Sequence, residues 1–439
     1  MPENGSIVFL MTPGNSIPDY LVNPTAATKV VQELKLMGIK YFLVFAETLD
    51  QYRIIGNAIK AAGLQFFSDE RWSFEGLIGP NAIGYFDPAQ YRQSRIDPFL
   101  LPLKREFPAS FIGFHFKDEP GLIHLDNLGK LKDCLSSQPE FEKMKVFVNL
   151  FPIHANYAAL SGLAHSLYGR RQPSEFGVDC SKDIIQNDKL VREMVEGYGA
   201  YVRMVMEKIR PDYLCFDLYP FYDGLENCNR ARELTMSANL KVISGNAWSA
   251  NITPIAYLQN FQVEDGFYAN FHHLRWFTSW ALAFGIKEFS NFISHDGILD
   301  EKKSTGLLDS RNEKTKLGGD QQSVFGFLRN IQEELALFRY RGFVAPFLNV
   351  MTGDLVGWLP SAEILAGEYL SGNANQVMVF FARRPIEGKV QTEVGLNSWY
   401  SRIEQLDVGT GQWALVGQNT NGIRLTLEEW PGALYRLTK

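Results

Sequence analysis

The sequence lacks several features that define whole classes of protein. Its four cysteines, Cys134, Cys180, Cys215 and Cys228, form no CxxC pair and no metal-like spacing, so we expect free thiols rather than a disulfide framework or a cysteine-bound metal. No apolar run approaches the roughly 20 residues that cross a bilayer. The 43 basic and 49 acidic residues give a net charge of −6 without a basic run, which argues against nucleic acid and anionic membranes as partners.

Signals for export, cofactors and nucleophilic catalysis are also missing. The N-terminal "SIVFLMTPG" is too short for a signal-peptide core and has no basic flank, so it favours a strand. Because a signal could have been trimmed from the chain, the compartment stays open. We expect no cofactor, since neither GxGxxG nor GxxxxGK[ST] occurs, and no serine nucleophile, since GxSxG is absent. His272 and His273 are adjacent and would point apart on a helix, so no metal site is expected.

What the sequence does contain is an alternation of apolar runs with amphipathic segments such as "TAATKVVQELKLMG". Eight runs have the composition of strands, at residues 6–13, 39–47, 64–71, 111–118, 144–151, 212–219, 240–247 and 286–293. Eight strands that alternate with helices predict an α/β fold, a parallel (β/α)8 TIM barrel. A doubly wound sheet is the alternative, but it usually has fewer strands and a glycine-rich phosphate turn.

The periodicity changes after the amphipathic segment that ends in "LALFRYRG". Short runs such as "NQVMVFFARR" and "QWALVGQ" follow, separated by turn sequences such as "GTGQ" and "NTNG", which is typical of antiparallel hairpins. We therefore predict two domains, a barrel over 1–342 and a small antiparallel β-sandwich over 343–439. The second domain is expected to cover a face of the barrel or to act as a separate module.

The fourth predicted strand, "FIGFHFKDEPG", ends in three charged residues before a Pro-Gly stop. Barrel active sites lie at the carboxyl ends of the strands, so this end should reach the site. Alternation of side chains puts His115, Lys117 and Glu119 on the inner face and Phe114 and Asp118 on the helix-facing side. Glu119 is therefore predicted to stand at the mouth of the barrel.

Other predicted strand ends carry carboxylates, amides and aromatic rings. They are Glu47; Asp69, Arg71 and Trp72; Asn149; Asp217 and Tyr219; Asn246 and Trp248; and Glu288 in the last strand. Hydroxyls need directional hydrogen-bond partners and sugar rings stack on aromatic rings, so the set suits a sugar, with Trp72 and Trp248 as the stacking rings. For each residue alone, a role in a salt bridge or a helix cap is an equal alternative. The prediction rests on the occurrence of all these residues at the same end of the barrel.

A glutamate before proline at the end of strand four, here Asp118-Glu119-Pro120, resembles the acid/base motif of clan A glycoside hydrolases, which is usually Asn-Glu-Pro. The "KDEP" end, "DYLCFDLYPF" and "WALAFGIKEFSNFI" resemble the β-galactosidase-like glycosidases of polysaccharide-degrading bacteria, and the resemblance covers most of the chain. It implies a TIM-barrel glycosidase with a sugar substrate and a carboxylate pair, in which Glu119 is the general acid/base. The acidic and aromatic mouth, with Arg71, Arg170 and Arg171 as its few cations, predicts a neutral oligosaccharide or a small glycoside.

One departure from that clan matters for the mechanism. Retaining members take their nucleophile from a glutamate at the end of strand seven, whereas "LKVISGNAWSANITP" contains no acid. Asp217 is the best substitute, because it shares a face with Tyr219 and a polar residue in such an apolar run needs a reason to be buried; Glu288 and Asp69 follow. Pairing of Asp217 with Lys117 is the structural alternative. A barrel that only binds glycan is the alternative to the enzyme.

The segment 153–187 is too long for an ordinary barrel connection and belongs to the side of the predicted site. Long loops there are commonly functional, so its Tyr157, Tyr168, Arg170 and Arg171 are candidates for substrate contacts, with a loose linker as the alternative. A carbohydrate is the partner that the sequence predicts. The sugar, its anomer and the oligomeric state are not predicted.

Overall fold

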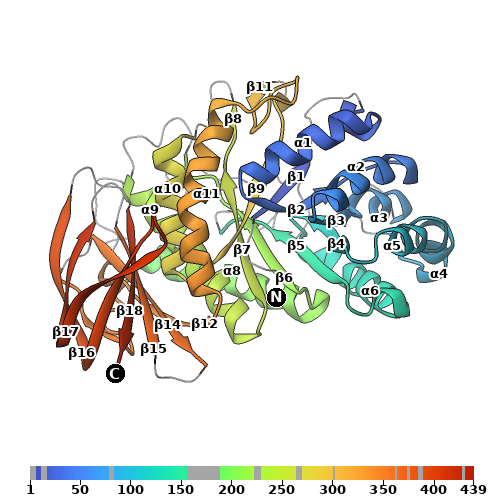
Figure 1. Ribbon diagram of the computed structural model, residues 1–439. Coiled ribbons are helices and arrows are strands. Elements are labelled where there is room, and N and C mark those ends of the chain that lie inside the picture. The colour runs from blue at the N-terminus through green and yellow to red at the C-terminus, as the bar shows by residue number, and fades with distance from the viewer. Residues whose placement is uncertain are drawn as a thin grey trace.

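The core of the molecule is a closed barrel of eight parallel strands (Figure 1). The computed structural model describes residues 6–10, 17–78, 84–153, 155, 188–221, 229–263, 269–299, 302–360, 363–372, 376–383, 389–427 and 431–439. In barrel order the strands are β1 (Ser6–Leu10), β2 (Ile39–Val44), β3 (Gln65–Asp69), β4 (Phe111–Asp118), β5 (Lys145–Leu150), β6 (Tyr213–Asp217), β7 (Thr253–Gln259) and β9 (Glu288–Phe292). The predicted (β/α)8 barrel is confirmed.

The seventh strand does not lie where the sequence predicted it. Residues 240–247 belong to the helix α9 (Asn229–Ser249), and β7 begins only at Thr253. Met236, Leu240, Ile243 and Ala247 are buried at a spacing of three or four residues, which is the periodicity of a helix. The true strand has Pro254 at its second position, and proline within an apolar run argues against a strand.

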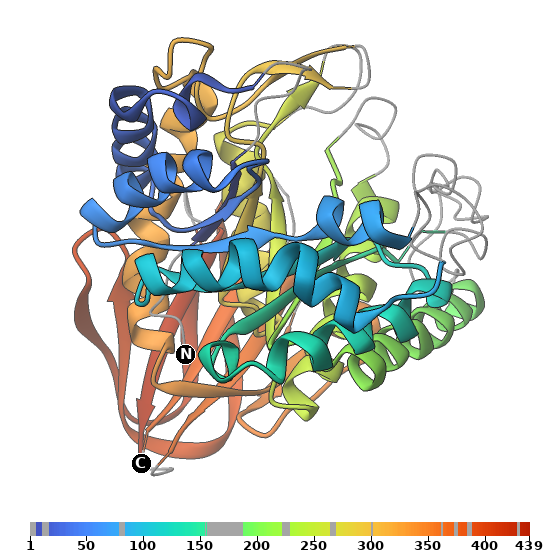
Figure 2. The same ribbon diagram turned by 90° about the vertical axis from the view of Figure 1, so that its right-hand side faces the viewer.

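Helices surround the barrel, and the views from two sides show them covering its outer face (Figure 2). They are α1 (Pro24–Leu36), α2 (Leu49–Ala61), α3 (Arg71–Ile78), α4 (Pro88–Tyr91), the π-helical segment η2 (Arg92–Leu100), α5 (Leu101–Glu106), α6 (Leu125–Ser136), α8 (Asp188–Ile209), α9, α10 (Phe271–Ala283) and α11 (Lys316–Leu335). Local sequence starts several of them: Asn23 caps α1 ahead of Pro24, and Thr48 forms a capping box with Gln51. None of the helices described is long and apolar enough to cross a membrane.

Side chains fill the barrel in two directions, as the pleat of each strand requires. The outward-facing residues, such as Val8, Phe66 and Phe114, join the main core beneath the helices. The inward-facing residues form a separate cluster that includes Phe9, Phe67, Phe147, Cys215 and Tyr257. The inside of the barrel is therefore packed in its lower layers, and a site must lie at its carboxyl end.

The carboxyl end of the barrel also carries a small antiparallel sheet (Figure 1). Its strands are β8 (Gln262–Val263), β10 (Gly297–Leu299) and β11 (Lys302–Thr305), in the order β10-β11-β8. These strands follow β7 and β9 in the chain, so they extend one side of the mouth. No pattern in the sequence predicted this sheet.

The chain after α11 forms the predicted antiparallel β-domain. Its strands are β12 (Phe338–Val344), β13 (Val356–Trp358), β14 (Ile364–Ser371), β15 (Gln376–Arg383), β16 (Val390–Asp407), β17 (Gln412–Leu427) and β18 (Gly432–Thr438). The first half of β16 pairs with β13 and its second half with β18, so the sheet folds over a second core of its own. The predicted boundary at 342/343 falls inside β12.

The C-terminal sheet packs against the carboxyl end of α10. The ring of Trp280 stacks on Phe347 with centroids 5.6 Å apart, and Phe284 contacts Phe343 at 4.8 Å. A side chain in place of Gly367 would run into the backbone of Ala283, so the sheet approaches the helix more closely than any other residue would allow. The main core therefore continues from the barrel into the C-terminal domain.

Candidate functional site

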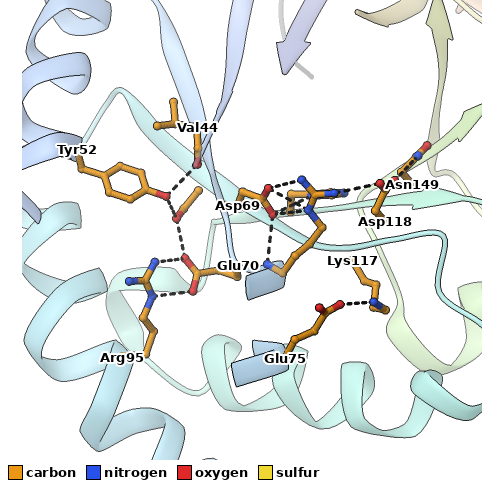
Figure 3. A network of polar contacts seen from close by, with 12 residues as sticks. Val44, Tyr52, Asp69, Glu70, Glu75, Arg95, Lys117, Asp118 and Asn149 are labelled. Carbon is orange, nitrogen blue, oxygen red and sulfur yellow. Dashed lines mark hydrogen bonds and ion pairs between the residues drawn. The ribbon is translucent and has the colours of Figure 1, made fainter. Parts of the chain in front are cut away.

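The carboxyl ends of β3, β4 and β5 meet in a polar network that is buried except at Asp118, here called the inner network: Asp69, Arg71, His115, Asp118 and Asn149. Arg71 donates to both carboxylate oxygens of Asp69, with its Nη2 2.7 Å from Oδ2, and its Nη1 lies 3.0 Å from Asp118 Oδ2. Asn149 Nδ2 donates to Asp118 Oδ1 over 2.7 Å. Four of the predicted site residues are therefore brought together, and Figure 3 shows Asp69, Asp118 and Asn149 within this network.

Electrostatics hold Asp69 in its charged form. Burial by itself would raise the pKa of Asp69, but the charge of Arg71 and the contact with His115 outweigh it and hold the pKa well below its usual range. The guanidinium of Arg71 also lies over the ring of Phe9, 5.0 Å from its centroid. Arg71 is thus fixed by two carboxylates and a ring at once.

Two acceptor atoms of the inner network have no hydrogen-bond partner among the described residues. His115 Nδ1 lies 3.2 Å from Asp69 Oδ1, and because an ionised carboxylate only accepts, Nδ1 carries the hydrogen. In a neutral imidazole of that tautomer, Nε2 is the acceptor. His115 Nε2 is buried without a partner, as is Asn149 Oδ1. Buried polar atoms are nearly always paired, so these two acceptors suit a molecule that donates hydrogen bonds.

A β-bulge turns Asp118 into this network. His115 lies opposite Phe147, and Asp118 lies opposite Asn149. Over this interval β4 advances by three residues and β5 by only two, which is the extra residue of a bulge. The predicted direction of His115 and Phe114 is confirmed, but those of Asp118 and Lys117 are wrong. Asp118 faces the mouth, and Lys117 binds Glu75 on α3, not Asp217, because the extra residue breaks the alternation.

A second network, here called the outer network, lies on the other side of the same strand end: Tyr52, Ser68, Glu70, Tyr91 and Arg95. Glu70 Oε2 accepts from Arg95 Nε at 2.9 Å and from the Tyr91 hydroxyl at 2.8 Å, and Oε1 accepts from Arg95 Nη2 at 3.0 Å and from Ser68 at 2.6 Å. Sequence reasoning missed this network, because Arg95 lies 25 positions after Glu70 in the π-helical segment η2 and carries no motif.

Glu119 directly follows the last residue of β4. Its backbone N–H donates to the carbonyl of Asn149 over 2.9 Å, and its φ of +48° places it in the left-handed region. A residue with a side chain is strained there, and such strain tends to occur at functional sites. The Glu119 side chain is almost fully buried. The next carbonyl, that of Pro120, accepts from the Tyr201 hydroxyl of α8 at 2.8 Å.

Asp217 ends β6, and the alternation along the strand puts it on the inner face with Cys215, against whose cluster the predicted companion Tyr219 packs. Burial raises the pKa of Tyr198 and of Tyr201 well above the usual value, and the negative charges of Asp217 and Glu119 both add to this effect. Two carboxylates from different strands therefore act on the same two hydroxyls of α8. Burial, and then the charge of Asp217, likewise raise the pKa of the Cys215 thiol.

Aromatic rings form the opposite side of the mouth. Tyr219 stacks on Phe292 with centroids 6.3 Å apart and meets Phe261 edge-on at 4.9 Å, and Phe292 also stacks on Phe9. Trp72 is 57% exposed beside Phe45 at the start of α3. The predicted Tyr219 and Trp72 thus lie at the carboxyl end of the barrel.

Three predicted site residues lie elsewhere. Asn246 and Trp248 belong to α9, where Asn246 Nδ2 bonds its own helix at Val242 and Trp248 covers Lys287 behind the barrel wall, so their predicted place at a strand end is wrong. Glu288 is the first residue of β9, which puts it at the amino end, opposite the mouth. Glu47 lies exposed beyond β2. The predicted loop contacts Tyr157, Tyr168, Arg170 and Arg171 lie outside the described residues.

The described part of β7 and its exit carries no carboxylate from Thr253 to Val263. Its last residue, Gln259, exchanges two side-chain hydrogen bonds with the backbone of Phe221. The absence of an acid from strand seven, inferred from the wrong segment, therefore also holds for the true strand. In the described residues no group of three His, Cys, Asp or Glu side chains could hold a metal ion.

Comparison with known proteins identifies the fold. No family model and no curated protein matches the sequence. A noncanonic maltogenic α-amylase, AmyB of Thermotoga neapolitana, is similar over 99% of both chains at 10% identity, with a TM-score of 0.50. A β-galactosidase of Halorubrum lacusprofundi also matches, at 10% identity with a TM-score of 0.40, over 74% of this chain and 58% of that chain. Gas2p of Saccharomyces cerevisiae, in complex with laminaritriose and laminaritetraose, matches at 12% identity with a TM-score of 0.42, over 73% of this chain and 64% of that chain. The expected resemblance to TIM-barrel glycoside hydrolases is confirmed for the fold.

Proposed function

We propose that the protein is a glycoside hydrolase that acts on a neutral oligosaccharide or glycoside, with Glu119 as general acid and Asp217 as the second carboxylate. The observation that carries the proposal is the place of the two buried carboxylates at the carboxyl end of the barrel, where Glu119 directly follows β4 and Asp217 ends β6. Glycosidases use a pair of carboxylates that flank the scissile bond. The strained backbone of Glu119 adds support, because a fold retains such strain where it serves a purpose.

The choice of a neutral sugar rests on the chemistry of the mouth. Its buried acceptors, His115 Nε2 and Asn149 Oδ1, suit hydroxyl donors, and the rings of Tyr219 and Phe292 suit the apolar face of a pyranose. Arg71, the cation of the inner network, is already bound to Asp69 and Asp118. A phosphorylated or carboxylated ligand would need cations that are not already paired.

In the proposed reaction Glu119 protonates the glycosidic oxygen as the bond to the anomeric carbon breaks. Asp217 then has one of two roles, which the stereochemistry of the product separates. As a nucleophile it would form a glycosyl ester that water hydrolyses, with retention; as a base it would deprotonate a water that attacks the opposite face, with inversion. The anomer released first, read by proton NMR, assigns the role.

A barrel that binds glycan without hydrolysis is the second candidate. Gln259 favours it, because an amide stands at the end of the strand from which retaining members of the resembled clan take their nucleophile, and its side chain is held by Phe221. Binding of oligosaccharide without turnover in the intact protein would support this candidate.

The test is a comparison of wild type with Glu119→Gln on aryl glycosides. Loss of a general acid costs roughly 10²–10⁴-fold in turnover, and we expect that loss with a poor leaving group and a much smaller one with an acidic phenol, which leaves without a proton. Glu393→Gln, at an exposed carboxylate of the C-terminal sheet, is the matched control and should keep wild-type rates. Full activity of Glu119→Gln on poor leaving groups would remove Glu119 from the mechanism.

A further inference from the structure

Two tryptophans stand exposed on the C-terminal sheet, far along the chain from the mouth. Trp358 ends β13 with 55% of its surface exposed, and Trp399 lies in β16 with 68% exposed. Large rings left in water are costly, since each forgoes the burial that drives folding. Core packing therefore does not account for an exposed pair on one face.

The alternating burial along β16 leaves both rings on the exposed side of the sheet. Val394 and Leu396 of β16 are buried, so the alternate residues Gly395, Asn397 and Trp399 point outward. The side chain of Trp358 lies beside Gly395, and a Cβ built on that glycine would be 3.6 Å from Trp358 Cβ. A register shift between Val356 and Trp358 allows this outward turn. Trp358 lies opposite Gly395, four residues before Trp399 in β16, and the pairing of β16 with β17 shifts register between Gly395 and Tyr400.

The surroundings of the rings are polar and of balanced charge. Asn397 lies between them, and its amide binds the carbonyls of Gly353 and Asp354. Beside it, Arg341 and Asp354 form an exposed ion pair, 2.5 Å from Nε to Oδ2, whose charges cancel. Flat rings with a neutral polar rim suit a neutral polyhydroxylated chain, whose apolar faces stack and whose hydroxyls find partners.

We propose that Trp358 and Trp399 form a glycan-binding platform for a neutral polysaccharide, separate from the barrel mouth. The C-terminal sheet, which carries both rings, lies on the opposite side of the molecule from the barrel helices α2 to α6 (Figure 1). It requires a ligand long enough to contact both rings, an oligomer rather than a single sugar. The ligand class is that of the proposed function, but the residues are different, so either proposal can fail without the other.

A purely stabilising contact and a dimer interface are the alternatives to a platform, and each predicts a different result. The ring of Trp358 covers Gly395, and aromatic residues stabilise glycines across strands in this way; this accounts for stability but not for Trp399. Contact with a second copy of the chain would place both rings in an interface, and would be seen as a dimer lost on substitution. The platform predicts ligand retention that depends on both rings in a monomer or in an oligomer that persists without them.

The test is affinity electrophoresis of the full chain in gels that contain a β-1,4-galactan, a β-1,3-glucan or a soluble α-1,4-glucan. A Glu119→Gln background prevents hydrolysis, so retention is read without catalysis. We expect at least one polymer to retard the protein, and Trp358→Ala or Trp399→Ala to weaken that retention about tenfold or more, the usual effect of removing an aromatic anchor. Tyr85→Ala, at a ring on the barrel side that is 81% exposed, is the matched control and should bind as the parent does.

Three outcomes overturn the proposal: no retention by any of the three polymers, retention that survives the double tryptophan variant, or retention lost only together with a dimer. If an alanine variant unfolds, Trp358→Tyr and Trp399→Tyr keep a ring and should keep part of the binding. Turnover of small aryl glycosides by variants with an intact Glu119 should be unchanged. That readout separates the platform from the catalytic proposal.

Discussion

Two networks of similar composition lie back to back at the end of β3, and they differ in one respect. Asp69 and Glu70 are neighbours in sequence, each binds an arginine, and each is fully buried (Figure 3). In the outer network four hydrogen bonds occupy both oxygens of Glu70. In the inner network His115 Nε2 and Asn149 Oδ1 are left without a partner in the described part of the chain.

The difference is the one expected if the outer network has a structural role and the inner network the proposed binding role. One acid and one arginine give the outer pair a formal charge of zero, and a satisfied buried pair mainly holds its elements together. Two acids and one arginine give the inner network a formal charge of −1, and its spare acceptors keep a capacity for donors. Adjacent residues of one strand end can thus serve the fold on one side of the wall and the ligand on the other.

The largest expected effect tests the structural role of the outer network. Arg95→Met leaves the buried Glu70 carboxylate uncompensated, and we expect a loss of about 3–5 kcal/mol in the free energy of unfolding. Urea denaturation measures it. Arg53→Met, at an arginine that is 43% exposed despite its two acidic partners, should cost at most about 1 kcal/mol. Equal losses in the two variants would contradict the distinction between them.

A smaller effect, on catalysis rather than on stability, is expected at Asn149. Asn149→Ala removes one buried acceptor and the hydrogen bond to Asp118. We therefore expect kcat/KM for glycosides to fall about tenfold, and the free energy of unfolding to fall by only about 1 kcal/mol. Asn246→Ala, whose side chain binds its own helix, is the control and should leave kcat/KM unchanged. If Asn149→Ala lost as much stability as Arg95→Met without a change in kcat/KM, the inner network would also be structural.

The smallest effect concerns the backbone of the mouth. Glu119→Gly and Glu119→Ala both remove the side chain, but only glycine relieves the left-handed conformation, so the glycine variant should be more stable by about 1 kcal/mol. Thermal unfolding of the two variants measures the difference. At Asp118, the last residue of β4, which is outside the left-handed region, the order should reverse, with alanine the more stable. A glycine variant of Glu119 that is less stable than the alanine variant would show that the position is not strained.

Much of the fold could be predicted, because most of its strands are apolar runs between amphipathic helices. The periodicity located β1 to β6 and β9 to within a few residues, and the change of period before Gly342 located the C-terminal sheet. β7 was missed for a local reason, since Pro254 lies within it and the preceding helix contains a β-branched stretch, 240–247. Neither feature contradicts a barrel, so the strand count held while one strand was misplaced.

The candidate site was less predictable, because its side-chain directions depend on pairing between strands. The alternation of side chains along β4 predicted the direction of His115 correctly. It predicted the wrong direction for Asp118, because the bulge against β5 adds a residue before it. The predicted places of Asn246 and Trp248 were wrong because they depended on the misplaced seventh strand. The partners of Glu70 could not be found at all, because Tyr91 and Arg95 reach it from a segment that no periodicity describes.

The bulge in β4 also constrains how this strand end can vary. Lys117, Asp118 and Glu119 are consecutive, yet they serve α3, the inner network and the surroundings of α8 respectively. A substitution alters one of these three directions and leaves the others. An insertion or deletion between His115 and Glu119 would instead change the direction of all three side chains at once, because it would move each of them to a different position relative to β5. Among descendants of this chain, the residue types here should therefore drift more readily than the number of residues.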